Sequence, residues 1–223
     1  MYTKNLVTTL SMLSICVILV IYCYFYIDKP VAEFFYVYHG LTKTESLLRI
    51  SVRFSTVLLE YLPPFIFLFF LLKNNIFRPL GKNEKVFMAI ALSATLATSI
   101  KNILKFVFGR YWPATFIGNN PSWLQSHKYG FNFFHSGASY NSFPSGHTAA
   151  IFAIMTIIWI IYPKWRWLSM LSCATMMISL VVLDYHFVSD VIAGMFLGII
   201  TAQNITYYFL RPHTNIEPKL HDI

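Results

Sequence analysis

Two short stretches of the chain carry the residue types that phosphoryl transfer needs. The first is Pro144-Ser145-Gly146-His147, and the second is His186 followed four residues later by Asp190. If the first stretch begins a helix, backbone N–H groups can bind an anion beside His147. A spacing of four places Asp190 on the same helical face as His186, where its carboxylate can orient the imidazole. This pattern indicates covalent phosphoryl transfer with a histidine nucleophile.

Basic residues that could hold the phosphate precede both stretches. Lys101, Lys105 and Arg110 lie at or just beyond the end of one apolar run. Ionisable groups at a membrane are costly and mark candidate functional sites. We therefore expect Lys105 and Arg110 to be functional residues that lie near Ser145 and Gly146. The alternatives are that Lys105 only extends its ammonium group to the membrane interface and that Arg110 only anchors the end of its span at that interface. Lys101 is left outside the predicted site as an interfacial lysine or an ion-pair partner.

The elements that must position these residues are membrane-spanning helices. The 223 residues are 57% hydrophobic and 12% charged, which is typical of a polytopic membrane protein. No basic run with interleaved aromatic residues lies outside the spans, so nucleic-acid binding is not expected. The sequence predicts one all-α domain over residues 1–223, a six-helix transmembrane bundle with its core site region at 101–190. The spans are Leu6–Ile27, Phe54–Leu72, Val86–Phe108, Thr148–Tyr162, Leu168–Leu183 and Val188–Leu210.

The placement of basic residues predicts the orientation of the bundle. Lysines and arginines concentrate in the short segments between the second and third spans and between the fourth and fifth spans. Loops of this kind are cytoplasmic in most membrane proteins. The protein is then expected in the cytoplasmic (inner) membrane, with both termini in the cytoplasm. The C-terminal side includes a polar tail at 211–223. The long aromatic loop from Gly109 to Gly146 and the turn at 184–190 fall together on the outer, periplasmic face.

These motifs, in this order, resemble the type 2 phosphatidic acid phosphatase family. Its pattern is a lysine, six residues and Arg-Pro, then Pro-Ser-Gly-His, then Ser-Arg, five residues, a histidine, three residues and an aspartate. Lys105, residues 144–147, Ser179 and the His186–Asp190 pair match it. The resemblance covers about residues 105–190 and implies a membrane enzyme that acts on lipid phosphates without a cofactor or a metal ion.

Two family arginines are absent from their usual places. Trp112 stands where the family has the arginine of Arg-Pro, and Leu180 stands where it has the arginine of Ser-Arg. Residues 109–113, with Asn119–Ser122 after them, resemble a branch of the family that has Gly-Arg-x-Trp-Pro instead. In that branch Arg110 would replace at least one of the missing arginines. Weaker candidates for the remainder are Lys101, Lys128 and His135.

The resemblance implies a mechanism in two steps. His186 attacks phosphorus to form a phosphohistidine, and Asp190 holds its other ring nitrogen. His147 protonates the leaving lipid oxygen and then activates water. The phosphate-binding residues that the resemblance implies are Lys105, Arg110, Ser145 and Gly146, which stabilise charge on the phosphoryl oxygens. The substrate classes that the family implies are phosphatidic acid, phosphatidylglycerol phosphate, polyprenyl pyrophosphate and lipid A phosphate.

Two other functions and one further residue stay open at this stage. The same intermediate could pass its phosphoryl group to a second lipid, which would make the protein a phosphotransferase. A non-catalytic membrane protein that binds lipid phosphate would also fit the missing arginines. Glu60 lies within the second span, where a carboxylate could relay protons. The simpler interpretation is that Glu60 lies near the outer interface or pairs with a lysine.

Overall fold

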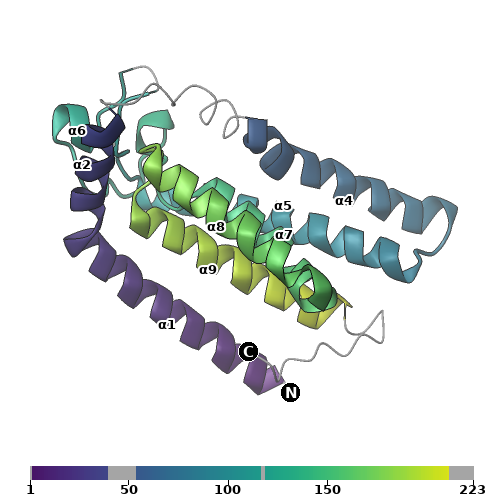
Figure 1. Ribbon diagram of the computed structural model, residues 1–223. Helices are drawn as coiled ribbons and strands as arrows, with labels where there is room; N and C mark the ends of the chain where they lie inside the picture. The colour runs from purple at the N-terminus through teal and green to yellow at the C-terminus, as the bar shows by residue number, and fades with distance from the viewer. Residues whose placement is uncertain (1, 40–53, 117–118, 211–223) are drawn as a thin grey trace.

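The computed structural model describes residues 2–39, 54–116 and 119–210, and every regular element within them is helical (Figure 1). The predicted tail at 211–223 lies outside these ranges. The α-helices are α1 (Tyr2–Tyr26), α2 (Asp28–His39), α4 (Leu62–Leu72), α5 (Lys82–Phe108), α6 (Trp123–Ser126), α7 (Gly146–Ile161), α8 (Arg166–Val182) and α9 (Val188–Ile205). Single π-helical turns cover Val57–Tyr61, Lys73–Phe77 and Thr206–Leu210, and 3₁₀ turns cover Ala138–Tyr140 and Pro163–Trp165.

The prediction of an all-α membrane bundle is confirmed, although the count of six full-length spans is not exact. Among the described residues, five stretches are long and apolar enough to cross a membrane: Asn5–Tyr26, Phe54–Phe77, Lys82–Phe108, Pro163–Val182 and Val188–Leu210. The sixth, α7, is apolar but has only 16 residues, against the ~20 that a bilayer requires. It begins at the Pro-Ser-Gly-His stretch and ends just before Pro163, which fixes its length. The chain is a multi-pass membrane protein.

Helix α7 lies at the centre of the bundle, and small residues let its neighbours approach closely. It packs against α5, α8 and α9. A Cβ atom on Gly194 of α9 would lie only 2.5 Å from the carbonyl oxygen of Ser145. Small residues at such crossings are typical of membrane helix pairs. The close approach sets the start of α9 against the start of α7, where the Ser145 N–H donates to the Asp190 carbonyl at 3.0 Å.

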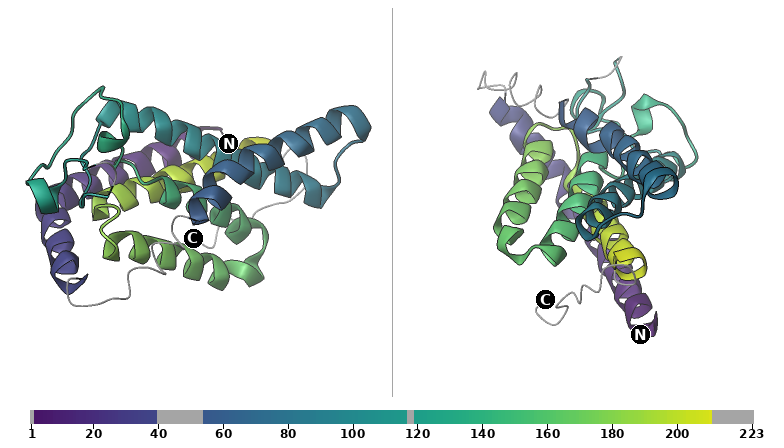
Figure 2. Two further views of the ribbon diagram at one scale, coloured as in Figure 1. Left: turned by 90° about the horizontal axis from the view of Figure 1, so that it is seen from above. Right: turned by 90° about the vertical axis from the view of Figure 1, so that its right-hand side faces the viewer.

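The first helix is followed by a second one that the sequence did not predict. Helix α2 begins at Asp28, where a polar loop was expected, and has 12 residues. Figure 1 shows it turning away from α1 across the end of the bundle, and the views in Figure 2 show the same arrangement. It contacts α6, α8 and α9, while α1 packs along α9. The N-terminal pair α1–α2 therefore closes the end of the bundle where α9 begins.

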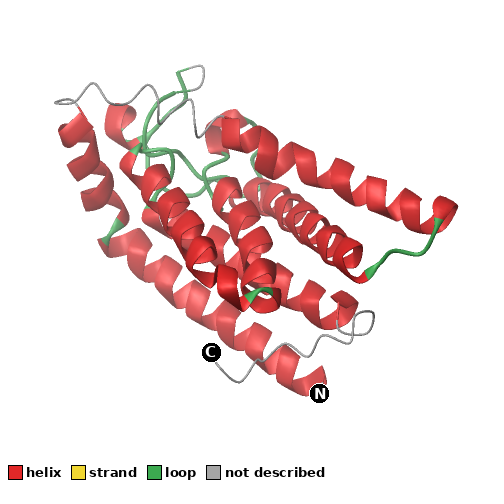
Figure 3. Ribbon diagram, turned by 45° about the vertical axis from the view of Figure 1, so that its right-hand side comes forward, coloured by secondary structure: helices red, strands yellow, loops and turns green. Residues whose placement is uncertain are grey.

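The segment between α5 and α7 is a folded layer at one end of the bundle (Figure 3). It holds short backbone bridges, in which the Asn132 N–H donates to the Gly109 carbonyl at 2.7 Å and the Ser142 N–H donates to the Arg110 carbonyl at 3.2 Å. Aromatic rings pack beneath it, with the Phe131 ring within 6 Å of the Phe108 and Phe143 rings. These contacts hold Arg110 and the residues after it in fixed positions.

Candidate active site

The structure brings the ends of α5, α7 and α9 together, and the predicted histidine–aspartate pair lies where they meet. His186 is 5% exposed and Asp190 is fully buried. Their nearest atoms, His186 Nδ1 and Asp190 Oδ2, are 3.6 Å apart, and Nδ1 has no hydrogen-bond partner. Burial lowers the pKa of His186, and the charge of Asp190 partly opposes that shift. Burial therefore favours the neutral form of the imidazole over the cation.

Asp190 is positioned by the local structure of the helix that carries it. Asp190 is the third residue of α9, and its carboxylate accepts from the Phe187 backbone N–H at 3.0 Å. This hydrogen bond is a capping interaction. The same oxygen accepts from the Ser142 hydroxyl at 2.6 Å. A structural role at the helix start and a role beside His186 are thus combined in one side chain.

His147 is the second residue of α7. Ser145 is the N-cap residue of this helix, and its hydroxyl is 3.1 Å from that of Thr148. Ser145 and Gly146 are buried, whereas His147 is half-buried. The His147 Nε2 atom is 2.7 Å from the Thr56 hydroxyl. The helical residues at 54–56 therefore contact His147, the predicted acid–base group.

Arg110 lies in a fully buried ionic network. One terminal nitrogen donates to Asp190 and to the Ser189 hydroxyl, and the other donates to Asp28 Oδ2 at 2.7 Å. Asp28 also accepts from the Ser189 backbone N–H at 2.9 Å. Burial by itself would lower the pKa of Arg110, but the two carboxylates raise it above its ordinary value. The guanidinium is charged, and both of its terminal nitrogens donate to protein groups, while its buried Nε atom has no hydrogen-bond partner in the described part of the chain.

Aromatic rings enclose this network on its remaining sides. The guanidinium carbon is 4.5 Å from the centroid of the Phe187 ring and 5.0 Å from that of Phe131. The Tyr129 hydroxyl is 3.2 Å from both Arg110 and Asp28, and burial raises the pKa of this phenol. Water is excluded from the buried Arg110–Asp28 pair, and this strengthens the attraction between the two charges.

Sequence reasoning missed Asp28 and Ser189 as members of this cluster. The only signal for Asp28 was its position directly after the first apolar run, where an acidic residue also fits an ordinary loop. Ser189 carries no signal, since its role depends on which side chains the fold sets opposite the start of α9.

Trp112 occupies the place of a missing family arginine and packs against the predicted nucleophile. The centroids of the Trp112 and His186 rings are 5.2 Å apart. The Lys105 ammonium is 5.7 Å from the Trp112 ring centroid, and the Trp112 N–H donates to the Ala138 carbonyl at 2.7 Å. Lys105 is also close enough to Lys101, Glu60 and Asp190 for their charges to interact. Lys105 therefore lies between the His186–Asp190 pair and the part of the site that holds Lys101 and Glu60.

Glu60 and Lys101 form an ion pair of 2.8 Å, which agrees with the expectation that Glu60 pairs with a lysine. The other weak candidates lie elsewhere. Lys128 and His135 are exposed in the loop, and Leu180 is fully buried in α8 against Leu183 and Val191. Within the described ranges, no group of three or more histidine, cysteine or carboxylate side chains could hold a metal ion.

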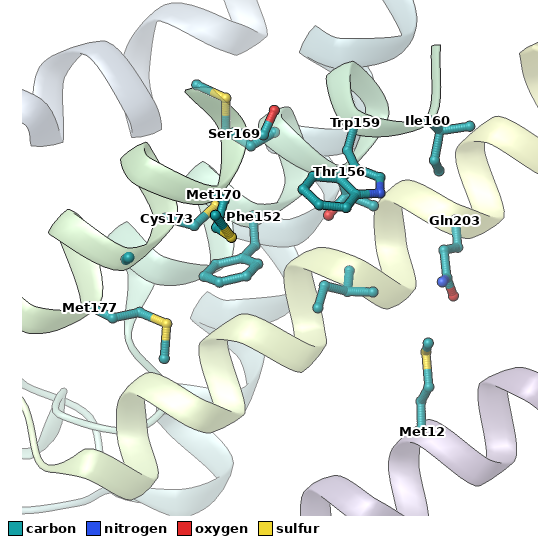
Figure 4. Close-up of a pocket in the computed structure, with 13 residues that line it drawn as sticks. Met12, Phe152, Thr156, Trp159, Ile160, Ser169, Met170, Cys173, Met177 and Gln203 are labelled. Carbon is teal, nitrogen blue, oxygen red and sulfur yellow. The ribbon is translucent and has the colours of Figure 1, made fainter. Parts of the chain in front are cut away.

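An open apolar pocket of about 470 Å³ lies between helices of the bundle, away from this site (Figure 4). Its walls come from α1, α7, α8 and α9 and include Met12, Trp159, Cys173 and Gln203. None of the predicted site residues lines it.

Comparison with known proteins identifies a family for the part of the chain that holds Lys105, His147, His186 and Asp190. The sequence model of the PAP2 superfamily matches residues 86–213. A lipid A 1-phosphatase of Rhizobium etli is 32% identical over 117 residues, which cover 51% of this chain and 44% of that protein. An undecaprenyl-diphosphatase of Sulfolobus acidocaldarius is 26% identical over 118 residues, or 52% of each chain. The chain thus spans about half the length of the curated relatives it matches. No solved structure matches it significantly.

Proposed function

Since this chain belongs to the PAP2 superfamily, we propose that it is a metal-independent lipid phosphate phosphatase that works through a phosphohistidine. The observation that carries the proposal is the convergence of the buried His186–Asp190 pair, the start of α7 with His147, and Lys105 at one end of a membrane bundle. The names of the relatives, a lipid A 1-phosphatase and an undecaprenyl-diphosphatase, support a phosphorylated membrane lipid as the substrate.

The proposed reaction has two displacements at phosphorus. In the first, neutral His186 attacks, the bond from phosphorus to the lipid oxygen breaks, and His147 gives its proton to that oxygen. In the second, His147 takes a proton from water, which attacks phosphorus and breaks the phosphorus–nitrogen bond. Inorganic phosphate leaves, and both histidines return to their starting forms. Asp190 stabilises the charge that develops on the imidazole of His186 in each step.

Lys105, Ser145 and the Gly146 N–H are proposed to hold the phosphoryl oxygens at the start of α7. For Arg110 we propose a positioning role. Its complete burial and its bonds to Asp28, Ser189 and Asp190 favour this role over contact with phosphate. By this proposal Arg110 acts on the reaction through Asp190, whose position it fixes. The same network supports treating residues 1–223 as one domain, because it joins α2 to the start of α9.

We further propose that the site faces the outer side of the cytoplasmic membrane and that both termini are cytoplasmic. Lys73, Arg78, Lys82 and Lys85 lie between or beside α4 and α5, at the end of the bundle remote from the loop at 109–145. This distribution is the one that the positive-inside tendency predicts. A cysteine introduced at exposed Lys128 should be labelled from outside in intact cells, while one at exposed Lys82 should be labelled only after lysis.

The central test measures phosphate release from defined lipids by the full-length protein in detergent with EDTA. The panel holds phosphatidic acid, phosphatidylglycerol phosphate, a polyprenyl pyrophosphate and lipid A. Wild-type protein should release phosphate, whereas His186→Ala and His147→Ala should not, because His147 acts in both displacements. His127→Asn, at an exposed loop position with positive φ, is the control. Release by His186→Ala would reject the nucleophile.

The same assay separates the two alternative functions. A phosphotransferase would place labelled phosphate on an added acceptor lipid and release little of it into solution. A protein that only binds lipid phosphate would bind vanadate without hydrolysing any of these lipids.

A further inference from the structure

We infer that Lys101 is a phosphate-binding residue of this site, and that the Glu60 carboxylate is its counterion until a phosphate displaces it. This inference rests on the proposed function, because it assumes that phosphate binds at the start of α7. Neither residue belongs to the family pattern described above.

The position of the ion pair is the first observation. A Cβ atom on Gly146 would lie 3.0 Å from Lys101 Nζ and would also collide with Glu60 Oε1. Both charged groups therefore lie against the backbone of the first residue of α7. The carboxylate occupies space beside helical N–H groups, where an anion is favoured. Any phosphate that binds there meets Lys101 and competes with Glu60.

The balance of charge in the site is the second observation. Arg110 is already paired with Asp28 and Asp190, so it offers no charge to a further anion. Lys101 is paired with Glu60, whereas Lys105 has no carboxylate within ion-pair distance among the described residues. A phosphomonoester carries a charge of about −1.5 to −2 near pH 7. Release of Lys101 from Glu60 would supply the second positive charge that such an anion requires.

The two partners differ in how readily they can separate. The Lys101 side chain is 4% exposed, whereas that of Glu60 is 19% exposed. Glu60 lies in the π-helical turn Val57–Tyr61, a type of local distortion that is frequent at functional sites. Thr56, four residues earlier, contacts His147. Lys101 is thus the fixed partner on α5, and Glu60 is the partner whose side chain can move aside.

A purely structural ion pair makes a different prediction. Removal of one partner would leave a buried charge and destabilise the fold, but it would leave phosphate affinity unchanged. The inferred role requires opposite effects of the two partners on phosphate affinity. Loss of the lysine should weaken binding, while loss of the competing carboxylate should strengthen it.

The experiment measures binding of inorganic phosphate to the full-length protein in detergent by calorimetry and by the shift in its thermal unfolding. Lys101→Met should bind phosphate about tenfold more weakly, the effect of losing one charge-assisted hydrogen bond. Glu60→Gln should bind it several-fold more tightly. The double variant removes both charges and guards against misfolding of the single variants. It should bind phosphate more weakly than Glu60→Gln, because it lacks the lysine, and more tightly than Lys101→Met, because it also lacks the competing carboxylate. The control is Lys73→Met, which breaks a 2.6 Å pair with Glu84 at the remote end.

Unchanged phosphate affinity in Lys101→Met, or equal affinity in Glu60→Gln and the double variant, would overturn the inference, and so would weaker binding by Glu60→Gln. These outcomes are independent of catalysis. If phosphate binding follows the expected order but no lipid is hydrolysed, the proposed function fails and the role of Lys101 stands. If hydrolysis is observed while Lys101→Met binds phosphate like the wild type, the proposed function stands and this inference fails.

Discussion

Arg110 donates a hydrogen bond of 2.7 Å to Asp28, and both side chains are fully buried. Asp28 is the first residue of α2 and lies outside the region matched to the PAP2 superfamily, which begins at residue 86. The same carboxylate accepts from the backbone N–H of Ser189, next to Asp190. The N-terminal helices therefore contribute directly to the position of the candidate catalytic aspartate.

Asp28→Asn should lower both stability and turnover. The amide keeps the size of the carboxylate but leaves the buried Arg110 with one negative partner instead of two. Breaking a buried ion pair costs about 3–5 kcal/mol, and we expect a loss in the lower part of that range because hydrogen bonds can persist. Thermal unfolding in detergent measures the first effect, and kcat on the best lipid measures the second.

Glu33→Gln is the matched control for Asp28→Asn. It makes the same charge change on the same helix, at an exposed position where the Trp123 N–H still finds an oxygen acceptor. Stability and turnover should stay at the wild-type level. If Asp28→Asn behaved like this control, the ionic network would have no part in positioning Asp190.

Arg110→Lys separates a positioning role from direct contact with phosphate. A single ammonium cannot reproduce the fork that binds Asp28 and Asp190 together. We expect stability to fall by about 3 kcal/mol and kcat to fall at least tenfold, while the affinity for inorganic phosphate changes little. Weaker phosphate binding without any loss of stability would instead identify Arg110 as a phosphate ligand.

The lowered pKa of His186 predicts how chemical modification of this side chain depends on pH in the acid range. The nucleophile must be neutral, and burial moves its pKa below the ordinary histidine value of about 6.5. Its neutral form should therefore persist as pH falls through 6.5, and folding should lose stability below that value because the unfolded chain binds the proton first. The measurement is the pH dependence of diethylpyrocarbonate modification at His186, followed by mass spectrometry.

N-acetylhistidine in the same buffers is the reference for that profile. The midpoint for His186 should lie on its acid side. A midpoint on the alkaline side would mean that Asp190 holds the imidazole as the cation and that burial does not decide its charge.

Gly194→Ala should disturb the site from a distance. The new Cβ would lie 2.5 Å from the Ser145 carbonyl oxygen and 3.1 Å from Thr148 Cβ, so α9 and the start of α7 must separate. Overpacking of this kind costs about 1–3 kcal/mol. We expect reduced thermal stability and a larger relative loss of kcat. Gly81→Ala is the control, because its Cβ would lie 3.6 Å from Glu84 Oε2, an ordinary van der Waals distance.

The sequence by itself determined the membrane class and the segments that hold the chemistry. Long apolar runs can bury their backbone polar groups in a bilayer only as helices, so composition and length predict the all-α bundle. The order of Lys105, Ser145-Gly146-His147 and the His186–Asp190 pair indicated three segments that would meet at one end. Helix α2 escaped detection, because a short amphipathic segment after a span resembles a polar loop.

Only the tertiary structure decided how the charges are paired. Arg110 has the same sequence context whether it contacts phosphate or is buried, and its environment depends on Asp28, which lies 82 positions away in the chain. Glu60 and Lys101 are likewise 41 positions apart and meet at Gly146 only through the packing of the helices. Electrostatic partnership depends on distance in space and on exclusion of water, and neither quantity is written in local sequence.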